Sequence, residues 1–198
     1  MKKLLTLLLA GMMVLSMAAC TSTGETNENQ EESRDVTTQV VVVGAGGAGM
    51  AAAIEATDQG LDVILIEKLA MVGGTTTMAS TAYNAGGMKL QLEADPPYTA
   101  DDAYAAWIGS GEDDPFIRLL SDRSGATGDW LVEMGADLGK FNGKQVMTSD
   151  GSALGPMLTA TLSAAVSERG IDLRTETAGK KLVTDEAGKV VGIEVEDG

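Results

Sequence analysis

The chain has 198 residues and a formal net charge of −15 at pH 7, with 29 acidic side chains against 14 basic ones and no histidine. Such an acidic surface argues against binding to nucleic acid and against electrostatic docking on anionic lipid. With 44% apolar residues, the chain has room for one domain with a sizeable core. Solubility is the simplest explanation of the acidity, and an acidic face for a basic redox partner is the alternative.

Residues 1–19 have the layout of a secretory signal, with two lysines, an apolar stretch and small residues just before Cys20. Because Cys20 is the only cysteine, we predict a bacterial lipoprotein signal, after which Cys20 is lipidated and becomes the mature N-terminus. An ordinary signal with an incidental cysteine is one alternative. A single spanning anchor is another, disfavoured because the apolar run is shorter than the about 18 to 20 residues that a bilayer needs. The predicted location is therefore outside the cytoplasm, anchored to the cell membrane by lipid.

The segment 20–38 then turns to Thr, Ser, Asn, Gln and Glu without apolar periodicity. This composition predicts a disordered acidic tether behind the lipidated cysteine. As a coil it would reach roughly 25 Å, enough to hold a folded domain clear of a membrane. Cleavage of residues 1–19 would remove two lysines and no acid, so the mature net charge would be −17 instead of −15.

The segment that follows predicts the start of a dinucleotide-binding fold. Val40–Val43 is a short β-branched run, typical of a strand buried on both faces of a parallel sheet. It continues into G-x-G-x-x-G. Gly44 would permit the tight turn, Gly46 would let backbone approach a pyrophosphate, and Gly49 would let the next helix lie close on the strand. The amides at the start of that helix, near Gly47, would face the diphosphate.

An acidic residue follows at the spacing that this fold requires. An Ala-rich helix is expected from about residue 47 to 59, ending at Gly60, and a strand over 62–66 then delivers Glu67. The distance from Gly49 to Glu67 is close to the about 20 residues expected of an acid that accepts the adenosine ribose hydroxyls. Because a carboxylate there would repel a 2′-phosphate, an NADP-type ligand is disfavoured. A solvated acid at a strand end is the alternative interpretation of Glu67.

A second glycine pair, Gly73 and Gly74, comes next with the hydroxyl run Thr75 to Thr77. A plain NAD-binding unit does not need this pair. The chain here resembles the FAD-binding flavoproteins of the fumarate reductase and succinate dehydrogenase superfamily, in particular its flavocytochrome c, urocanate reductase and 3-ketosteroid dehydrogenase branch. The resemblance covers residues 39–198 and rests on VVVVGAGGAGMAAAIEA, IEKLAMVGGTTTMAS, the Tyr83, Asn84, Ala85 segment and GIDLRTETAGKKLVTDEAGKVVGIEVEDG.

The resemblance implies an FAD site whose residues can be placed one by one. The glycines of the first loop would hold the pyrophosphate, the acid the ribose, the second loop the diphosphate and ribityl chain, and later segments the isoalloxazine and adenine. The residues so implied are Gly44, Gly46, Gly47, Gly49, Glu67, Lys68, Gly73, Gly74, Thr75, Thr76, Asn84 and Ala178. The family often carries Gly-Gly-Met-Asn beside the flavin ring, where this chain has Thr81, Ala82, Tyr83 and Asn84.

Past this region the pattern predicts further helices and a hairpin. One helix should start at Thr99 and carry Trp107, a second should start at Asp114 and Pro115, and a third should surround Trp130 and end at Gly135. Both tryptophans are interpreted as core residues in preference to flavin-stacking ones. The remaining expected elements are a helix over 158–169, a strand over 171–174 and a hairpin of 181–184 with 190–195.

The predicted fold is therefore α/β, a Rossmann-like FAD-binding domain over 39–198 with a parallel sheet and a β-hairpin, incomplete at the C-terminus. No metal site is expected, because the chain lacks histidine and has no cysteine after residue 20. The arginines at 118, 123, 169 and 174 lie on expected helix or strand surfaces. We therefore nominate no catalytic residue.

By resemblance, the complete enzyme would pass a hydride from reduced flavin to a carbon–carbon double bond next to a carboxylate or ketone, or run the reverse desaturation. Its expected partners are a small-molecule substrate, an electron-donor protein or quinol, and the membrane through the lipid anchor, with no nucleic acid. A capping domain would supply the substrate-binding groups, so residues 36–198 alone should be inactive. The alternatives are a non-catalytic nucleotide-binding lipoprotein or redox partner subunit, and an NAD-dependent dehydrogenase module, which the second glycine pair disfavours.

Overall fold

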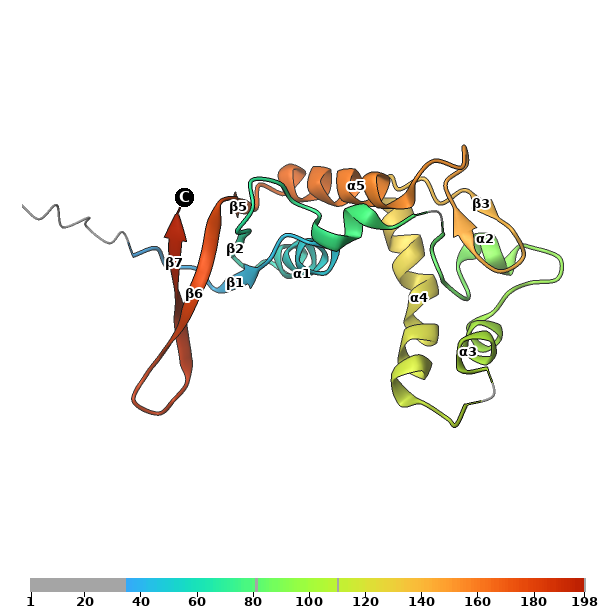
Figure 1. Cartoon of the computed structure of the whole chain (residues 1–198), viewed down its shortest axis with the longest axis horizontal. Helices are drawn as coiled ribbons and strands as arrows, with labels where there is room; N and C mark the ends of the chain where they lie inside the picture. The colour runs from blue at the N-terminus through green and yellow to red at the C-terminus, as the bar shows by residue number, and fades with distance from the viewer. Residues whose placement is uncertain (1–34, 81, 110, 198) are drawn as a thin grey trace, which may run out of the picture. The chain divides into compact units, whose positions relative to one another are not determined.

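The computed structural model describes residues 35–80, 82–109 and 111–197 (Figure 1). The chain divides into two units, residues 1–36 and 37–198, and all elements described below belong to the second. The predicted signal, Cys20 and most of the predicted tether lie outside the described residues. In chain order the elements are β1 Val40–Val43, α1 Gly47–Asp58, β2 Val63–Ile66, the 3-10 helix η1 Gly74–Met78, α2 Lys89–Leu92, α3 Ala100–Ile108, α4 Pro115–Glu133, β3 Lys140–Phe141, β4 Val146–Met147, α5 Leu154–Glu168, β5 Asp172–Arg174, β6 Thr177–Thr184 and β7 Val190–Asp197.

A three-stranded parallel sheet confirms the predicted fold class. Its order is β1-β2-β5, and Leu65 of β2 is in register with Val42 on one side and Leu173 on the other. The central strand β2 is buried along its whole length. The prediction that β1 is buried on both faces is wrong, because Val41 and Val43 are exposed. Only the other face of β1, with Val40 and Val42, packs against the core, so its side chains alternate in burial.

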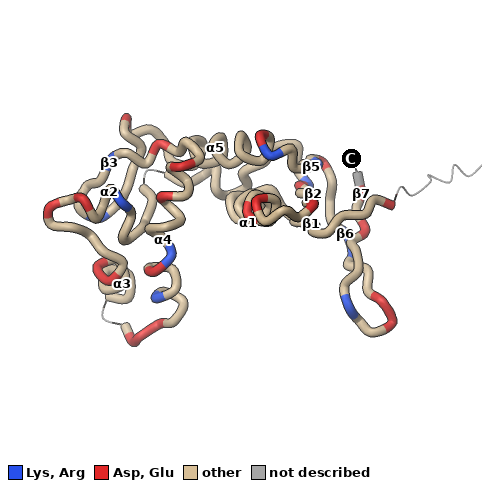
Figure 2. The backbone as a smooth tube through the Cα atoms, turned by 180° about the vertical axis from the view of Figure 1, so that it is seen from behind, with Lys and Arg blue, Asp and Glu red and all other residues tan. Residues whose placement is uncertain are grey.

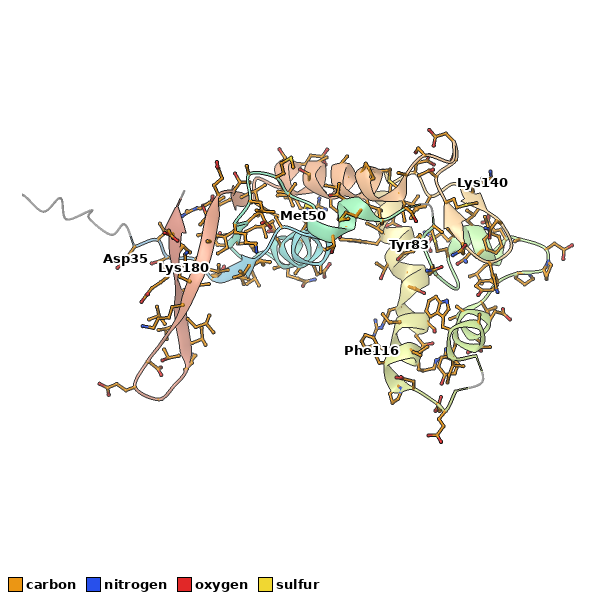
Figure 3. All side chains as sticks on the ribbon, viewed as in Figure 1. Asp35, Met50, Tyr83, Phe116, Lys140 and Lys180 are labelled. Carbon is orange, nitrogen blue, oxygen red and sulfur yellow. The ribbon has the colours of Figure 1, made fainter. Side chains whose placement is uncertain are left out.

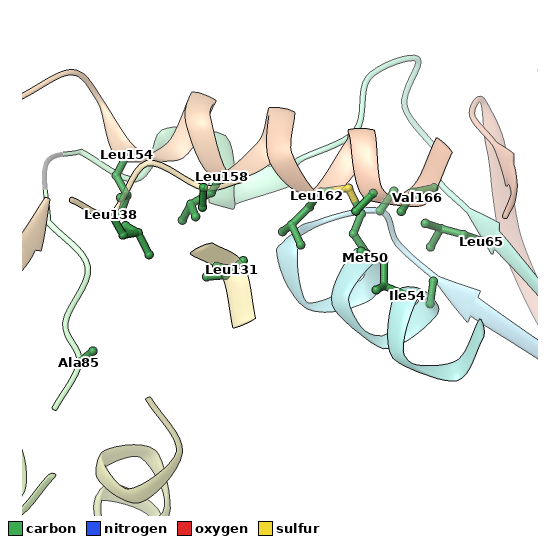
Figure 4. Packing of buried hydrophobic residues seen from close by; sticks show 14 of the residues in the cluster. Met50, Ile54, Leu65, Ala85, Leu131, Leu138, Leu154, Leu158, Leu162 and Val166 are labelled. Carbon is green, nitrogen blue, oxygen red and sulfur yellow. The ribbon is translucent and has the colours of Figure 1, made fainter. Parts of the chain in front are cut away.

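The core lies between the sheet and the helices α1 and α5. Met50 and Ile54 of α1 point toward Leu162 and Val166 of α5, and Leu65 of β2 lies beside them (Figure 4). All five side chains are at most 4% exposed. Burying a Leu, Ile, Val or Met side chain stabilises a fold by about 1.5 to 3 kcal/mol each, so this cluster fixes α1 and α5 on the sheet.

Two predicted helices, after Asp114 and around Trp130, form one continuous helix, α4. Its start is as predicted, because the Asp114 side chain accepts hydrogen bonds from the amides of Phe116 and Ile117 at 2.8 and 3.3 Å. The prediction of a break between them is wrong. The helix runs on through small residues, and Ser121, Gly125 and Gly128 among them are buried.

The glycines in the middle of α4 are tolerated because another segment packs against them. A Cβ at Gly125 would overlap the carbonyl oxygens of Gly86 and Gly87, and one at Gly128 would lie 2.6 Å from the Met88 sulfur. The segment 86–88 therefore packs directly on the backbone of α4. Glycine costs about 1 kcal/mol of helix propensity per residue, which this close packing offsets.

The other helix and hairpin predictions are partly confirmed. The Thr99 hydroxyl accepts the Asp102 amide at 3.2 Å while the Asp102 carboxylate accepts the Thr99 amide at 2.8 Å, so α3 begins with the expected cap. Helix α5 begins at 154 instead of 158, and the strands of the β6–β7 hairpin are longer than predicted. Trp130 packs against the core as expected, whereas Trp107 is only partly buried and lies outside the core cluster.

Acidic positions are spread along the described chain, including α3, the turn before α4 and the β6–β7 hairpin (Figure 2). This distribution agrees with the excess of acidic residues in the sequence. Within residues 35–197, apart from the two internal gaps, no helix combines the length and the apolar character needed to cross a bilayer.

Candidate cofactor site

The two glycine loops predicted from sequence meet at the carboxyl ends of the parallel strands. The Gly73 amide donates to the Ala45 carbonyl at 2.7 Å, and Gly46 pairs with Gly73 as an isolated parallel bridge. Gly73 has a φ of 104°, which side chains other than glycine rarely adopt. The structure therefore brings the first loop, Gly44 to Gly49, and the second loop, which starts at Gly73, into one surface.

The first loop has the geometry that its glycines predict. Gly44 leaves β1 with a φ of 97°, and its amide donates to the Ile66 carbonyl of β2 at 2.7 Å. A Cβ at Gly49 would overlap the Gly44 carbonyl oxygen. Helix α1 can therefore start directly above the turn only because position 49 carries no side chain.

The N-terminus of α1 carries free donors toward the loop. Its N-cap residue, Gly46, has no side chain to cap the helix, and the first turn has no acidic residue. The Gly47 amide donates to the Thr76 hydroxyl at 3.1 Å. The next amides, at Ala48 and Gly49, are at helix positions that have no intrahelical acceptor, so together with the helix dipole they suit an anionic group.

Glu67 is held at the end of β2 by two backbone donors. Its carboxylate accepts the Ala45 amide at 2.8 Å and the Leu69 amide at 3.0 Å. The side chain is 8% exposed, so the alternative of a solvated strand-end acid does not hold. Because a carboxylate has about four lone-pair directions, two remain for the hydroxyls of a ribose. Lys68, next to it, is exposed.

The β5–β6 segment lies along the backbone of Glu67. The Glu67 amide donates to the Arg174 carbonyl at 2.8 Å, and the Thr177 amide donates to the Glu67 carbonyl at 2.9 Å. Ala178, the residue expected at the adenine edge, follows Thr177 directly and is partly buried. A residue far along the chain is thus placed beside the predicted ribose acid.

Asn84 belongs to a different neighbourhood. Its side-chain oxygen accepts the Gln145 amide group at 2.8 Å, and the preceding residue, Tyr83, pairs with Val146 of β4. The Tyr83 hydroxyl donates to the Ser124 carbonyl of α4 at 3.1 Å, and Figure 3 shows Tyr83 beside that helix. Burial, and then the charge of Asp129, raise the pKa of Tyr83 to about 12, so it is a neutral donor at pH 7. Its neighbour Thr81 lies outside the described residues.

A depression of about 460 Å³ opens beside this segment, between it and the helices α3 and α4. Its lining is mostly aromatic or hydroxyl-bearing, with one cation: Tyr83, Asn84, Trp107, Leu120, Arg123, Ser124 and Thr127. Trp107, expected in the core, lies here instead because α3 and α4 leave part of the ring uncovered. Sequence reasoning did not find Ser124 or Gln145, since neither lies in a recognisable motif.

These residues fit a dinucleotide of the FAD type. The bare backbone cradle and the free amides of α1 suit a diphosphate, and Glu67 keeps acceptor capacity for a ribose. The second loop adds the Thr75 amide and the hydroxyls of Thr75 and Thr76, which can serve a polar chain, while the Thr76 amide already donates to the Gly73 carbonyl at 3.0 Å. Within the described part of the chain, no group of three or more His, Cys, Asp or Glu side chains could hold a metal ion.

Known proteins agree with this geometry. The family model described as FAD binding domain matches residues 39–198. A fumarate reductase (cytochrome) of Shewanella frigidimarina is 37% identical over 169 residues, covering 79% of this chain and 29% of that protein. A urocanate reductase of Eggerthella lenta is 29% identical over 166 residues, covering 78% of this chain and 27% of that protein.

Solved structures show the same fold. The open conformation of a flavocytochrome c3 fumarate reductase superposes with a TM-score of 0.68 at 32% identity, covering 82% of this chain and 31% of that one. A 3-ketosteroid-Δ4-(5α)-dehydrogenase from Rhodococcus jostii RHA1 gives 0.70 at 25% identity, covering 86% and 44%. The chain thus spans about 30% of the length of the curated relatives it matches. It belongs to the FAD binding domain family, and its cofactor is FAD.

Proposed function

We propose that this chain is the nucleotide-binding part of an exported, lipid-anchored FAD-dependent oxidoreductase. Its reaction would reduce, or form, a carbon–carbon double bond next to a carboxylate or ketone. The observation that carries this proposal is the joined pair of glycine loops with Glu67 buried beside the first of them, because this arrangement suits FAD.

The names of the relatives support the reaction class. They include a fumarate reductase, a urocanate reductase and an acrylate reductase flavoprotein subunit. Fumarate, urocanate and acrylate all contain a carbon–carbon double bond conjugated with a carboxylate. A reaction of that kind on this chain's complete protein follows by analogy.

Within such a protein, this chain's residues would bind and orient the cofactor. FAD when bound supplies the hydride chemistry. The α1 amides would hold the diphosphate and Glu67 would hold the ribose, so the ring system would be carried toward the Tyr83 and Asn84 segment. Tyr83, neutral at pH 7, keeps its hydroxyl on the Ser124 carbonyl and so fixes the backbone of this segment against α4. No residue described here is assigned as a proton donor.

Reconstitution of the intact protein tests the proposal. The protein is loaded with FAD, reduced viologen dye is the electron donor, and dye oxidation is followed after addition of fumarate, urocanate or acrylate. Acrylamide, which has an amide in place of the acid of acrylate, serves as a matched substrate control. Oxidation that depends on one of the three acids supports the proposal. A flavin-loaded protein that oxidises no dye with any of them, nor with the unsaturated ketone 4-androstene-3,17-dione, favours the non-catalytic lipoprotein or redox partner subunit instead.

Export and anchoring have a separate test at Cys20. Cys20→Ser removes the thiol, so we expect the protein to leave the membrane fraction or to remain unprocessed. Ser22→Ala, two residues away, is the matched control and should behave as wild type. If Cys20→Ser stays in the membrane fraction after a salt wash with normal processing, the lipid anchor is wrong.

A further inference from the structure

The second glycine loop continues into η1, a short 3-10 helix that cannot hold its own position. None of the residues of η1 is buried, and its N-terminus has no side-chain cap. Helices of this type have poor hydrogen-bond geometry and are short because of it. Contacts from elsewhere in the chain must therefore fix Thr75 and Thr76, which are expected to lie along the diphosphate and ribityl chain.

The first turn of α5 supplies backbone contacts to the exit of η1. The amides of Leu154 and Gly155 donate to the carbonyls of Ser80 and Ala79 at 2.8 and 2.9 Å. These are amides that a helix start leaves without an intrahelical acceptor. The start of α5 is thus satisfied by the segment that leaves η1, and this fixes where η1 ends.

Gly155 allows η1 to lie directly on α5. A Cβ at this position would overlap the carbonyl oxygens of Thr76 and Thr77. Gly155 is buried, and the η1 backbone occupies the space that a side chain there would need. Because the obstructing atoms are backbone, a side chain at position 155 would require α5 or η1 to move.

One turn further, Thr159 lies against Gly73, just before η1, and against Thr77 within it. Its hydroxyl lies 3.0 Å from the Thr77 hydroxyl, and either can donate. A Cβ at Gly73, just before η1, would lie 2.6 Å from the Thr159 methyl group. Thr159 therefore packs against the glycine that joins the two loops and holds the hydroxyl run by a hydrogen bond.

We propose that Gly155 and Thr159 of α5 are positioning residues of the FAD site. They hold η1 against α5, so the second loop faces the cofactor even though no residue of α5 belongs to either glycine motif. The proposal rests on the FAD site described above. It does not depend on the reaction that the complete protein performs, so a failure of dye oxidation would leave it standing.

The test compares the binding of two ligands to variants of the full chain. FAD, followed by quenching of its fluorescence, uses the second loop, whereas adenosine monophosphate, followed by calorimetry, needs only Glu67 and the first loop. Thr159→Val keeps the shape and removes the hydroxyl, so FAD affinity should fall about two- to tenfold, the range for one lost hydrogen bond. Affinity for adenosine monophosphate should not change, and Thr159→Ser should restore FAD binding.

Thr161→Val is the matched control, because its hydroxyl lies near the Met157 sulfur within α5 and not near η1. It should bind FAD as wild type does. Gly155→Ala should weaken FAD binding tenfold or more, and if this variant does not fold, the Thr159 series decides. Equal FAD affinity in Thr159→Val and wild type, a parallel loss of both ligands, or no FAD binding by the wild-type chain would overturn the proposal.

Discussion

Replacing Gly49 by alanine tests the part of the site that sequence and structure describe most fully. The added Cβ would lie much closer to the Gly44 carbonyl oxygen than the 3.0 Å that Cβ atoms keep from other heavy atoms. The Cβ is attached directly to the α1 backbone and the oxygen belongs to the Gly44 backbone, so no side-chain rotation can relieve the overlap. Helix α1 must therefore shift away from the turn. Overpacking of this kind costs about 1 to 3 kcal/mol, and the backbone position of both groups places Gly49→Ala at the upper end.

The shift would also separate the helix amides from the loop that must bind the diphosphate. We therefore expect Gly49→Ala to lower both the free energy of unfolding in urea and the affinity for FAD. Gly60→Ala is the matched control at the other end of α1, because its φ of 83° makes alanine unfavourable while no atom lies within 4 Å of the added Cβ. It should lose about 1 to 2 kcal/mol of stability and still bind FAD.

Two outcomes would refute this reasoning. If Gly49→Ala unfolds at the wild-type urea concentration and binds FAD with wild-type affinity, the close approach of α1 to Gly44 is not required. If both variants lose FAD affinity in proportion to their stability, position 49 acts through the fold alone and has no specific effect on the loop.

Three further predictions concern Glu67, α4 and the C-terminal end of α1. Glu67→Gln removes a charged acceptor worth about 1.5 to 3 kcal/mol, so titration of the apoprotein should show FAD affinity about tenfold or more lower. Gly125→Ala would press on the carbonyls of Gly86 and Gly87, and urea unfolding should show a loss of about 1 to 3 kcal/mol. In the wild type, the hydrogen bond from Arg169 lowers the pKa of Asp58. The ion pair therefore stabilises the fold above the unfolded-state pKa of about 4, and this stabilisation is lost as pH falls through the lower folded-state pKa. Asp58→Asn removes the ion pair. Urea unfolding should show a difference from wild type of about 0.5 kcal/mol at neutral pH that disappears in acid.

Features set by neighbouring residues could be predicted from the sequence. The strand before Gly44, the helix after it and the cap at Thr99 all follow from local sterics and hydrogen bonding, and the structure has each of them. The placement of Glu67 at the end of β2 also follows, because strand length and turn chemistry fix where a strand ends.

Features that depend on residues far apart in the chain could not be predicted from the sequence. The burial of β1 depends on whether both of its faces are covered, and Val43 is 60% exposed because one face is not. The continuity of α4 depends on the segment 86–88 packing against Gly125, which no local pattern of α4 reveals. Trp107 is an apolar residue of the kind that usually lies in a core, yet it is only partly buried and lines an open depression with residues of α4 and the Tyr83 segment.

The glycines of the site are of two kinds: some are required by their own backbone conformation and others by a distant packing partner. Only the first kind can be recognised in a sequence motif. Gly44 and Gly73 are required by their own backbone conformation, with φ values of 97° and 104°, so their necessity is local and shows in sequence. Gly155 has no such requirement, and it is needed only because the carbonyls of η1, at Thr76 and Thr77, lie against it. A cofactor site built from loops therefore depends on residues that carry no cofactor motif, and α5 is where this chain places them.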